Sequence, residues 1–171
     1  MNEFPKQKHP RLKEYDYGEN GAYFVTICTE GRKPILSHIA EGRVETLKDL
    51  LALSAKPPQV RLTKIGSIVE MYSRGMNTAY ENVSVDKYVI MPNHLHLLIT
   101  LADGGLRSSR PTIPTIVRSF KRMVTREVGT PIFQTSFYDH VVRGERDYWE
   151  IWQYIENNPA RWAEDELYCN P

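Results

Sequence analysis

Cysteine is scarce in this sequence, and its scarcity excludes two kinds of small stabilised domain. Only two cysteines occur among 171 residues, Cys28 inside a strand-like run and Cys169 near the end. No Cys-x-x-Cys spacing is present, so the chain offers neither a zinc ribbon nor a disulfide framework. This cysteine usage fits a reducing compartment.

Long hydrophobic runs are also missing. The longest apolar stretches, such as "HLHLLITLA", are much shorter than the roughly 20 residues that a membrane helix needs. The opening "MNEFPKQKHPRLKEY" lacks the apolar centre of a secretory signal. We therefore expect no membrane association and a location inside the cell, in the cytoplasm.

The chain has almost no net charge, +1 at pH 7, so bulk charge favours no particular partner. The distribution of charge is more informative. Residues 107–127 contain six basic side chains against one acid, and residues 164–166 are acidic. The six basic residues are Arg107, Arg110, Arg118, Lys121, Arg122 and Arg126. Such a cluster is either an ordinary solvated face or a surface that meets phosphates.

The pattern of apolar residues predicts an α+β fold. Glycine-bounded and β-branched runs predict strands at 22–29, 83–91, 94–101 and 133–142, with Pro92 and Asn93 as the turn between the middle two. Helical periodicity predicts helices at about 66–80, from Pro114 to about 128, and 146–158. This is the β-α-β-β-α-β order of a ferredoxin-like sandwich, with an antiparallel sheet, helices on one face and an added C-terminal helix.

We expect one domain over residues 1–171. Residues 1–21 are polar and rich in turn formers, which predicts an arm with little regular structure. Residues 40–64 have mixed signals, with a helix-like stretch "ETLKDLLALSA" followed by Pro57 and Pro58. This segment is interpreted as a peripheral insertion.

Two histidines lie one residue apart in the strand "HLHLLITL". Because side chains alternate along a strand, His94 and His96 share one face, while Leu95, Leu97 and Ile99 share the other. The leucine face should enter the core. Two neutral imidazoles so placed can bind one divalent ion. Two partly exposed histidines without a ligand are the alternative.

The last predicted helix carries a tyrosine and an amide away from its apolar stripe. Helical spacing puts Tyr148, Ile151, Trp152 and Ile155 on the buried side, and Asp147, Tyr154 and Asn158 on another side. If this helix packs against the histidine face, His94, His96 and Asn158 can share a metal ion, with the Tyr154 hydroxyl beside it.

Such a set suits phosphoryl chemistry. A divalent ion with open positions binds phosphate oxygens, and a tyrosine can act as the nucleophile. No Gly-x-x-x-x-Gly-Lys-Ser/Thr loop for nucleotide phosphates is present. Tyr138 and Tyr148 are rival nucleophiles, although either can be a packing residue. His140 is a partner of a site residue, a contact with DNA or a plain strand residue, and Asp147 is a helix cap or a charge on the helix dipole.

Three stretches of the sequence resemble a known family, the single-tyrosine HUH transposases, in their REP-associated branch. The stretches are "YVIMPNHLHLLI", "SFYDHVVRGERDYWEIWQYIENNPARW" and "RLKEYDYGENGAYFVTICT". The resemblance implies that His94 and His96 bind the metal, that Tyr154 forms a covalent 5′-phosphotyrosine and that Asn158 supplies the third ligand. It is poorest over about 40–64.

The same resemblance implies a divalent cofactor, Mg²⁺ or Mn²⁺, and a substrate of single-stranded or hairpin DNA formed by palindromic repeats. It implies a bacterial, DNA-associated protein that is a monomer or a homodimer. Arg107, Arg110, Arg118, Lys121 and Arg122 are then candidate DNA contacts. The alternatives are a DNA- or RNA-binding domain without catalysis on the same fold and, more distantly, a small-molecule metal hydrolase.

Overall fold

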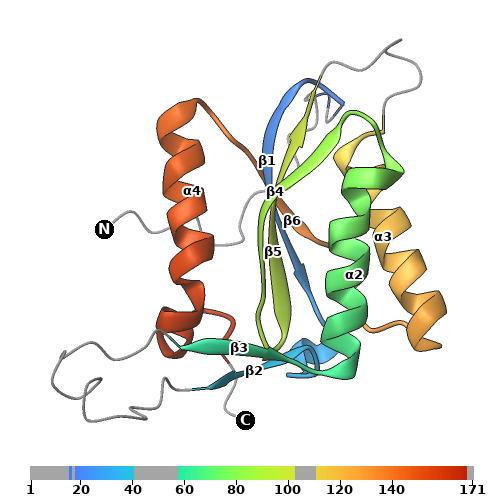
Figure 1. Cartoon of the computed structure of the whole chain (residues 1–171), viewed down its shortest axis with the longest axis vertical. Coiled ribbons are helices and arrows are strands. Elements are labelled where there is room, and N and C mark those ends of the chain that lie inside the picture. Colours follow the sequence, from blue (N-terminus) through green and yellow to red (C-terminus); the bar gives the residue numbers. More distant parts are fainter. Residues whose placement is uncertain (1–15, 17, 41–57, 103–110, 169–171) are drawn as a thin grey trace, which may run out of the picture.

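The centre of the computed structural model is a four-stranded antiparallel sheet (Figure 1). The structure describes residue 16 and residues 18–40, 58–102 and 111–168. The strands of the sheet are β1 (Gly21–Cys28), β4 (Val83–Ile90), β5 (His94–Leu101) and β6 (Tyr138–Val141). They lie in the order β4-β5-β1-β6, and every neighbouring pair is antiparallel. This is the strand order of a ferredoxin-like fold, so the predicted fold class is confirmed.

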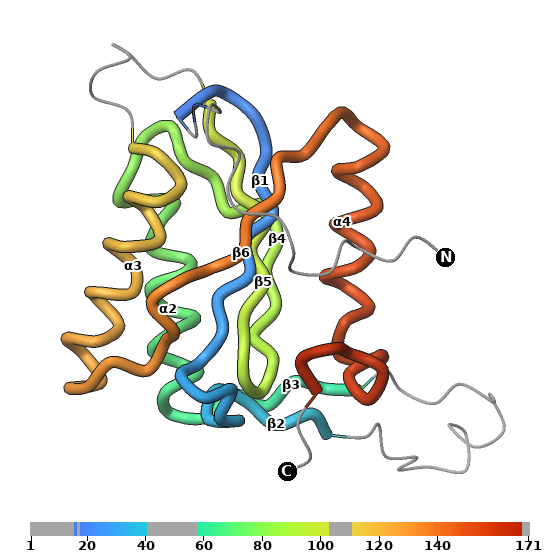
Figure 2. The backbone as a smooth tube through the Cα atoms, turned by 180° about the vertical axis from the view of Figure 1, so that it is seen from behind, coloured from blue at the N-terminus to red at the C-terminus, as the bar shows by residue number. Residues whose placement is uncertain are grey.

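Helices cover both faces of this sheet (Figures 1 and 2). Helices α2 (Lys64–Ala79) and α3 (Ile113–Val128) lie together on one face. Helix α4 (Glu145–Asn157) lies on the opposite face and continues into a 3₁₀ helix, η3 (Asn158–Glu164), with Pro159 in the first turn of η3. The two sandwich helices are therefore on one face as predicted, and the added helix gives the sheet a second covered face.

Local signals explain where the helices begin and end. The side chain of Thr63 accepts a hydrogen bond from the Gly66 amide at 3.0 Å and caps α2. Thr112 caps α3, and Pro114 stands in its first turn, where a missing N–H costs nothing. Gly129 ends α3 with φ 85°, a conformation that glycine adopts without strain.

The last strand is shorter than predicted. The pattern predicted a strand from 133 to 142, but the continuous ladder with β1 covers only Tyr138–Val141. Before it, an isolated bridge joins Phe133 to Thr29, and the Gln134 N–H donates to the Cys28 carbonyl at 3.0 Å. The backbone carbonyls of Gln134, Thr135 and Ser136 instead accept hydrogen bonds from the Lys121 ammonium. Because these carbonyls are turned toward one side chain, they are not available to a sheet ladder.

Two short strands lie at the start and near the end of the segment predicted as a peripheral insertion, residues 40–64. Strands β2 (Ser37–Ala40) and β3 (Gln59–Leu62) pair with each other antiparallel, and Ile39 and Val60 pack against the apolar residues under α4. Of these two residues only Val60 lies within 40–64, and the apolar alternation in "SHIA" and "QVRL" indicates the two strands only weakly. The helix-like stretch at 45–55 and nearly all of the predicted arm at 1–21 lie outside the described residues.

Two apolar clusters lie on the two faces of the sheet. The cluster between the sheet and helices α2 and α3 is the larger and includes Leu95, Leu97 and Ile99. The cluster under α4 is smaller and centres on Phe24, Leu98, Ile151 and Ile155, joined by Val89 and Met91. Among the described helices, none is long and apolar enough to cross a membrane.

Candidate active site

Strand β5 buries both histidines under α4. His94 has no exposed surface and His96 is 3 % exposed, and their Nε2 atoms lie 3.1 Å apart. The predicted alternation is confirmed, because Leu95 and Leu97 enter the cluster on the other side of the sheet. The alternative of two partly exposed histidines is wrong, since α4 and the segment after it cover the pair.

The burial of the histidines keeps both imidazoles neutral. Burial, with a smaller contribution from the positive charge of Arg32, lowers the pKa of His94 from 6.5 to about 3. Burial also lowers the pKa of His96 well below its ordinary value, and neighbouring His94 adds to this effect. Neutral imidazoles have a free ring lone pair, which is the form that binds a metal.

Helix α4 brings Tyr154 to the histidine pair. The Tyr154 hydroxyl lies 3.5 Å from His96 Nε2, and the ring packs edge-on against Phe24 with 5.8 Å between centroids. Burial raises the pKa of Tyr154, and the negative charge of Asp165 raises it further, while a hydrogen bond with Asn158 lowers it. The phenol is therefore protonated at neutral pH and has to lose its proton during any attack.

An acidic residue that the sequence did not single out completes the cluster. Asp165 follows η3, and one of its carboxylate oxygens lies within 4.8 Å of the ligand nitrogens of His94 and His96. Asn158, the predicted third ligand, is 3 % exposed and donates from Nδ2 to Asp165 Oδ2 at 3.1 Å. Its Oδ1 is buried and accepts no hydrogen bond from the described residues. Asp165 therefore joins Asn158 as a candidate oxygen ligand.

The sequence contained a weak signal for Asp165. It stands in the acidic stretch 164–166, which looked like a solvated tail. In the structure Glu164 and Glu166 are exposed, whereas Asp165 is turned inward and is half-buried. Spacing along the chain does not distinguish the three, because the turn after η3 decides which of them faces the histidines.

The rival tyrosines have other roles. Tyr148 donates its hydroxyl to Asp86 Oδ2 at 3.0 Å, and burial together with this carboxylate raises the pKa of Tyr148 to about 12. Tyr138 packs against the apolar cluster under α4. His140 pairs with Asp147 at 2.9 Å, so this histidine fastens β6 to the start of α4. Asp147 also accepts a hydrogen bond from the backbone N–H of Arg143 just before the helix.

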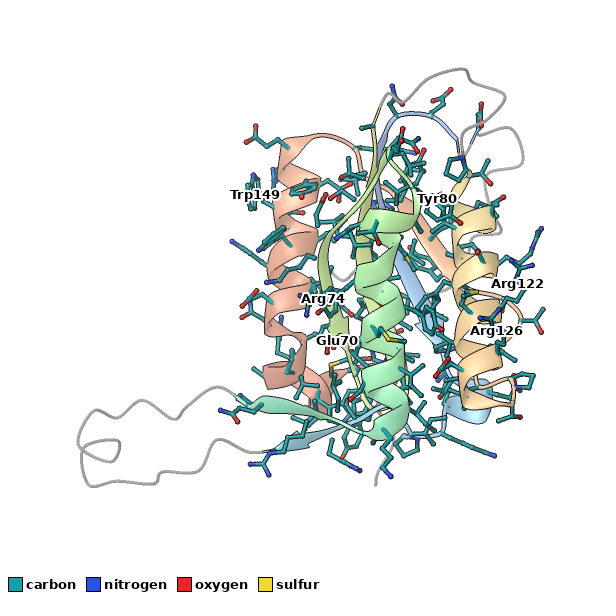
Figure 3. All side chains as sticks on the ribbon, turned by 45° about the vertical axis from the view of Figure 1, so that its right-hand side comes forward. Glu70, Arg74, Tyr80, Arg122, Arg126 and Trp149 are labelled. Carbon is teal, nitrogen blue, oxygen red and sulfur yellow. The ribbon has the colours of Figure 1, made fainter. Side chains whose placement is uncertain are left out.

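The predicted basic surface is not beside the histidines. Arg118 and Arg122 are exposed on α3, on the sheet face opposite α4, as Figure 3 shows for Arg122 and Arg126. Lys121 differs from them, because its ammonium is held by three backbone carbonyls and fastens the chain after α3. Arg107 and Arg110 lie outside the described residues.

Comparison with known proteins gives relatives over most of the chain. An uncharacterised protein of Haemophilus influenzae is 32 % identical over 181 aligned positions, which cover 94 % of this chain and 92 % of that protein. The chain belongs to the same family as this protein. No family model matches the sequence.

Two further comparisons concern the predicted resemblance. The REP-associated tyrosine transposase of Escherichia coli is 28 % identical over 78 residues, which cover 45 % of this chain and 44 % of that protein. A solved structure of a REP-associated tyrosine transposase bound to a REP hairpin matches the fold with a TM-score of 0.54 at 17 % identity, covering 94 % of this chain and 74 % of that one. The resemblance to this group of transposases is thereby confirmed.

Proposed function

We propose that this protein is a metal-dependent enzyme that cuts and rejoins single-stranded DNA through a covalent bond to Tyr154. One observation carries the proposal: the Tyr154 hydroxyl lies 3.5 Å from the nearer of two neutral, adjacent histidines that stand some sixty residues earlier in the chain. A core built for packing alone has no need to bury a phenol, two imidazoles, an amide and a carboxylate together.

The donor set fits a divalent cation. His94 and His96 offer two neutral ring nitrogens, and Asp165 and Asn158 offer oxygens, one of them buried and without a described hydrogen-bond partner. When bound, the cation would polarise the phosphorus and offset negative charge that develops on the phosphate oxygens. Mg²⁺ and Mn²⁺ are the proposed ions, and Mn²⁺ is the first to test because two of the donors are nitrogens.

Tyr154 supplies the nucleophile in this proposal. Its Oη forms a bond to phosphorus, and the bond between phosphorus and the 3′ oxygen breaks. The phenol gives up one proton and the departing 3′ oxygen gains one, so charge and protons balance. The product is a 5′-phosphotyrosine, and the reverse attack by a 3′ hydroxyl rejoins a strand without a nucleotide cofactor.

The substrate in this proposal is DNA that folds into hairpins, as palindromic repeats do. The solved relative is bound to a REP hairpin, which supports this choice of substrate. A DNA substrate in turn implies a cytoplasmic, DNA-associated enzyme. The five polar groups of the site can meet within one chain, and in this proposal the protein acts as a monomer that uses its own tyrosine or as a homodimer.

A second DNA contact is proposed on the opposite face of the sheet. Arg118, Arg122 and Arg126 are exposed at intervals of four residues on α3, so they form one stripe with about 6 Å between steps. None of the three has an ion-pair partner among the described residues. We propose that this stripe holds phosphates of the hairpin stem, away from the strand that is cut.

The covalent intermediate gives a direct test. Wild-type protein incubated with Mn²⁺ and a panel of single-stranded hairpin oligonucleotides should form a protein–DNA band that survives denaturation. The variant Tyr154→Phe removes the nucleophilic oxygen alone and should form none. The matched control is Tyr148→Phe on the same helix, which removes a hydroxyl bonded to Asp86 and should keep the band.

Two results would contradict the proposal. A band from Tyr154→Phe would mean that another residue attacks. Hairpin binding by wild type without any band, across the panel and with both metals, would favour a binding domain without catalysis.

A further inference from the structure

We infer that Asn93 and Thr26 are positioning residues that orient the two histidines for a cation. Asn93 holds His94 in one tautomer, whereas Thr26 can form a hydrogen bond with His96 in either of its tautomers. The inference deepens the proposed function and rests on it for the identity of the site. It comes from hydrogen bonds on the side of each ring that faces away from the candidate metal position.

The tautomer of His94 follows from a backbone carbonyl. Asn93 stands in the turn between β4 and β5 and is 1 % exposed. The backbone oxygen of Leu167, 2.7 Å from the Asn93 side chain, can only accept, so the Asn93 atom facing it is the Nδ2 donor. The other end of the amide is then the acceptor Oδ1, which lies 2.8 Å from His94 Nδ1.

These two hydrogen bonds together place the single ring proton of neutral His94 on Nδ1. Its Nε2 is left with a free lone pair, directed toward His96 and the candidate metal position. A ligating histidine commonly has its second nitrogen fixed in this way, which holds the ring and raises its basicity as a ligand. Asn93 therefore prepares one ligand before any cation arrives.

His96 is held differently. Its Nδ1 lies 2.8 Å from the hydroxyl of Thr26, which stands directly across from it on β1 and is 5 % exposed. The 3.1 Å contact between the two Nε2 atoms is a hydrogen bond only if one of them carries a proton. Because His94 has its proton on Nδ1, the donor in that contact is His96 Nε2. Thr26 then donates to His96 Nδ1.

For both Nε2 atoms to hold a cation, His96 would need its other tautomer. One proton leaves Nε2 and one is taken up on Nδ1, so the charge of the ring does not change, and Thr26 turns from donor to acceptor. A hydroxyl can do both, whereas an amide nitrogen or a carbonyl oxygen cannot. This difference explains why a hydroxyl, which can donate or accept, contacts His96 Nδ1, whereas an amide oxygen, which can only accept, contacts His94 Nδ1.

The test combines metal affinity with a direct observation of the ring protons. Thr26→Val keeps the shape of the side chain and removes the hydroxyl, so the affinity for Mn²⁺, followed by the resonance signal of free Mn²⁺, should fall roughly 10- to 100-fold. Thr26→Ser restores the hydroxyl and should restore most of the affinity. As a control, Ser73→Ala removes a buried hydroxyl on the other face of the sheet and should leave Mn²⁺ affinity unchanged.

Nitrogen-15 spectra of the histidine rings test the tautomers in the wild-type protein itself. Without added metal, His94 should carry its proton on Nδ1 and His96 on Nε2. With Zn²⁺, a diamagnetic ion that imidazole binds well, the His96 proton should be on Nδ1. This measurement stays decisive even if Thr26→Val does not fold.

Unchanged Mn²⁺ affinity in a folded Thr26→Val variant, or a proton on His94 Nε2, would overturn the inference. These failures are separate from failure of the proposed function. Wild type can form the covalent band while Thr26→Val binds Mn²⁺ normally, which defeats only the inference. The tautomers can also be as described while no band forms, which defeats only the function.

Discussion

The two faces of the sheet differ in what they bury. The face under α2 and α3 buries a large, almost wholly apolar cluster, including alternate residues of β5 such as Leu95 and Leu97. The face under α4 buries a smaller apolar cluster together with the side chains of His94, His96 and Asn158. Desolvating polar groups costs free energy unless they find partners. The face under α2 and α3 therefore stabilises the fold, and part of this stability offsets the cost of burying polar groups on the face under α4.

The largest expected effect is on the apolar face. Leu97→Ala removes a fully buried side chain from the cluster under α2 and α3, and the free energy of unfolding should fall by about 2–5 kcal/mol. The geometry of the site on the other face should remain. Denaturant unfolding measures the loss, and Mn²⁺ affinity of the folded fraction, measured at low temperature, should match that of the wild type.

A clear loss of Mn²⁺ affinity in that folded fraction would contradict this prediction, because it would show that the two faces do not act independently. A loss of stability below about 1 kcal/mol would show instead that the cluster under α2 and α3 is not the main source of stability.

Acid should weaken the α4 face selectively. The folded-state pKa of His94, about 3, lies below its ordinary value of 6.5, so the unfolded chain binds more protons between these two values. The stability contributed by the neutral ring is complete above about pH 6.5 and is lost progressively as pH falls toward 3. The free energy of unfolding should fall by up to about 1.4 kcal/mol per pH unit for each such histidine within this window.

Denaturant unfolding from pH 7 to pH 4 measures this slope. The double variant His94→Gln and His96→Gln should flatten it. A slope that the double variant leaves unchanged would assign acid sensitivity to other groups.

The smallest effect concerns the outer surface of α3. The triple variant with Arg118, Arg122 and Arg126 changed to Gln should weaken hairpin binding. The slope of the logarithm of the binding constant against the logarithm of salt concentration should become less steep by up to roughly 3, since each phosphate contact contributes about 0.9 to this slope. The rate of covalent bond formation at saturating DNA should not change, because α3, which carries the stripe, lies on the opposite face of the sheet from α4, which carries Tyr154 (Figure 1).

Titration of a labelled hairpin at several salt concentrations provides the numbers. A matched variant at Arg146 and Arg161, exposed arginines that are each paired with a glutamate, should leave the slope nearly unchanged. An unchanged slope in the α3 variant would make the stripe an ordinary solvated face.

Strong local signals made much of the fold predictable. The alternation of His94 and His96 with leucines predicted both faces of β5, and Pro114 and Pro159 marked a helix start and a helix end correctly. The weaker alternation at Ile39 and Val60 predicted nothing useful, because strands of four residues bury too few side chains to produce a clear pattern.

The candidate site divides in the same way. The sequence by itself determined that two imidazoles share a strand face and that Tyr154 and Asn158 stand one turn apart on a helix, because residue spacing sets direction within one element. It did not determine that α4 covers the histidine face, that Asp165 rather than its acidic neighbours turns inward, or that the arginines of α3 lie on the opposite side. Those outcomes depend on how separate elements pack and on one turn after η3. Tertiary structure alone brings such distant residues within a few ångströms of each other.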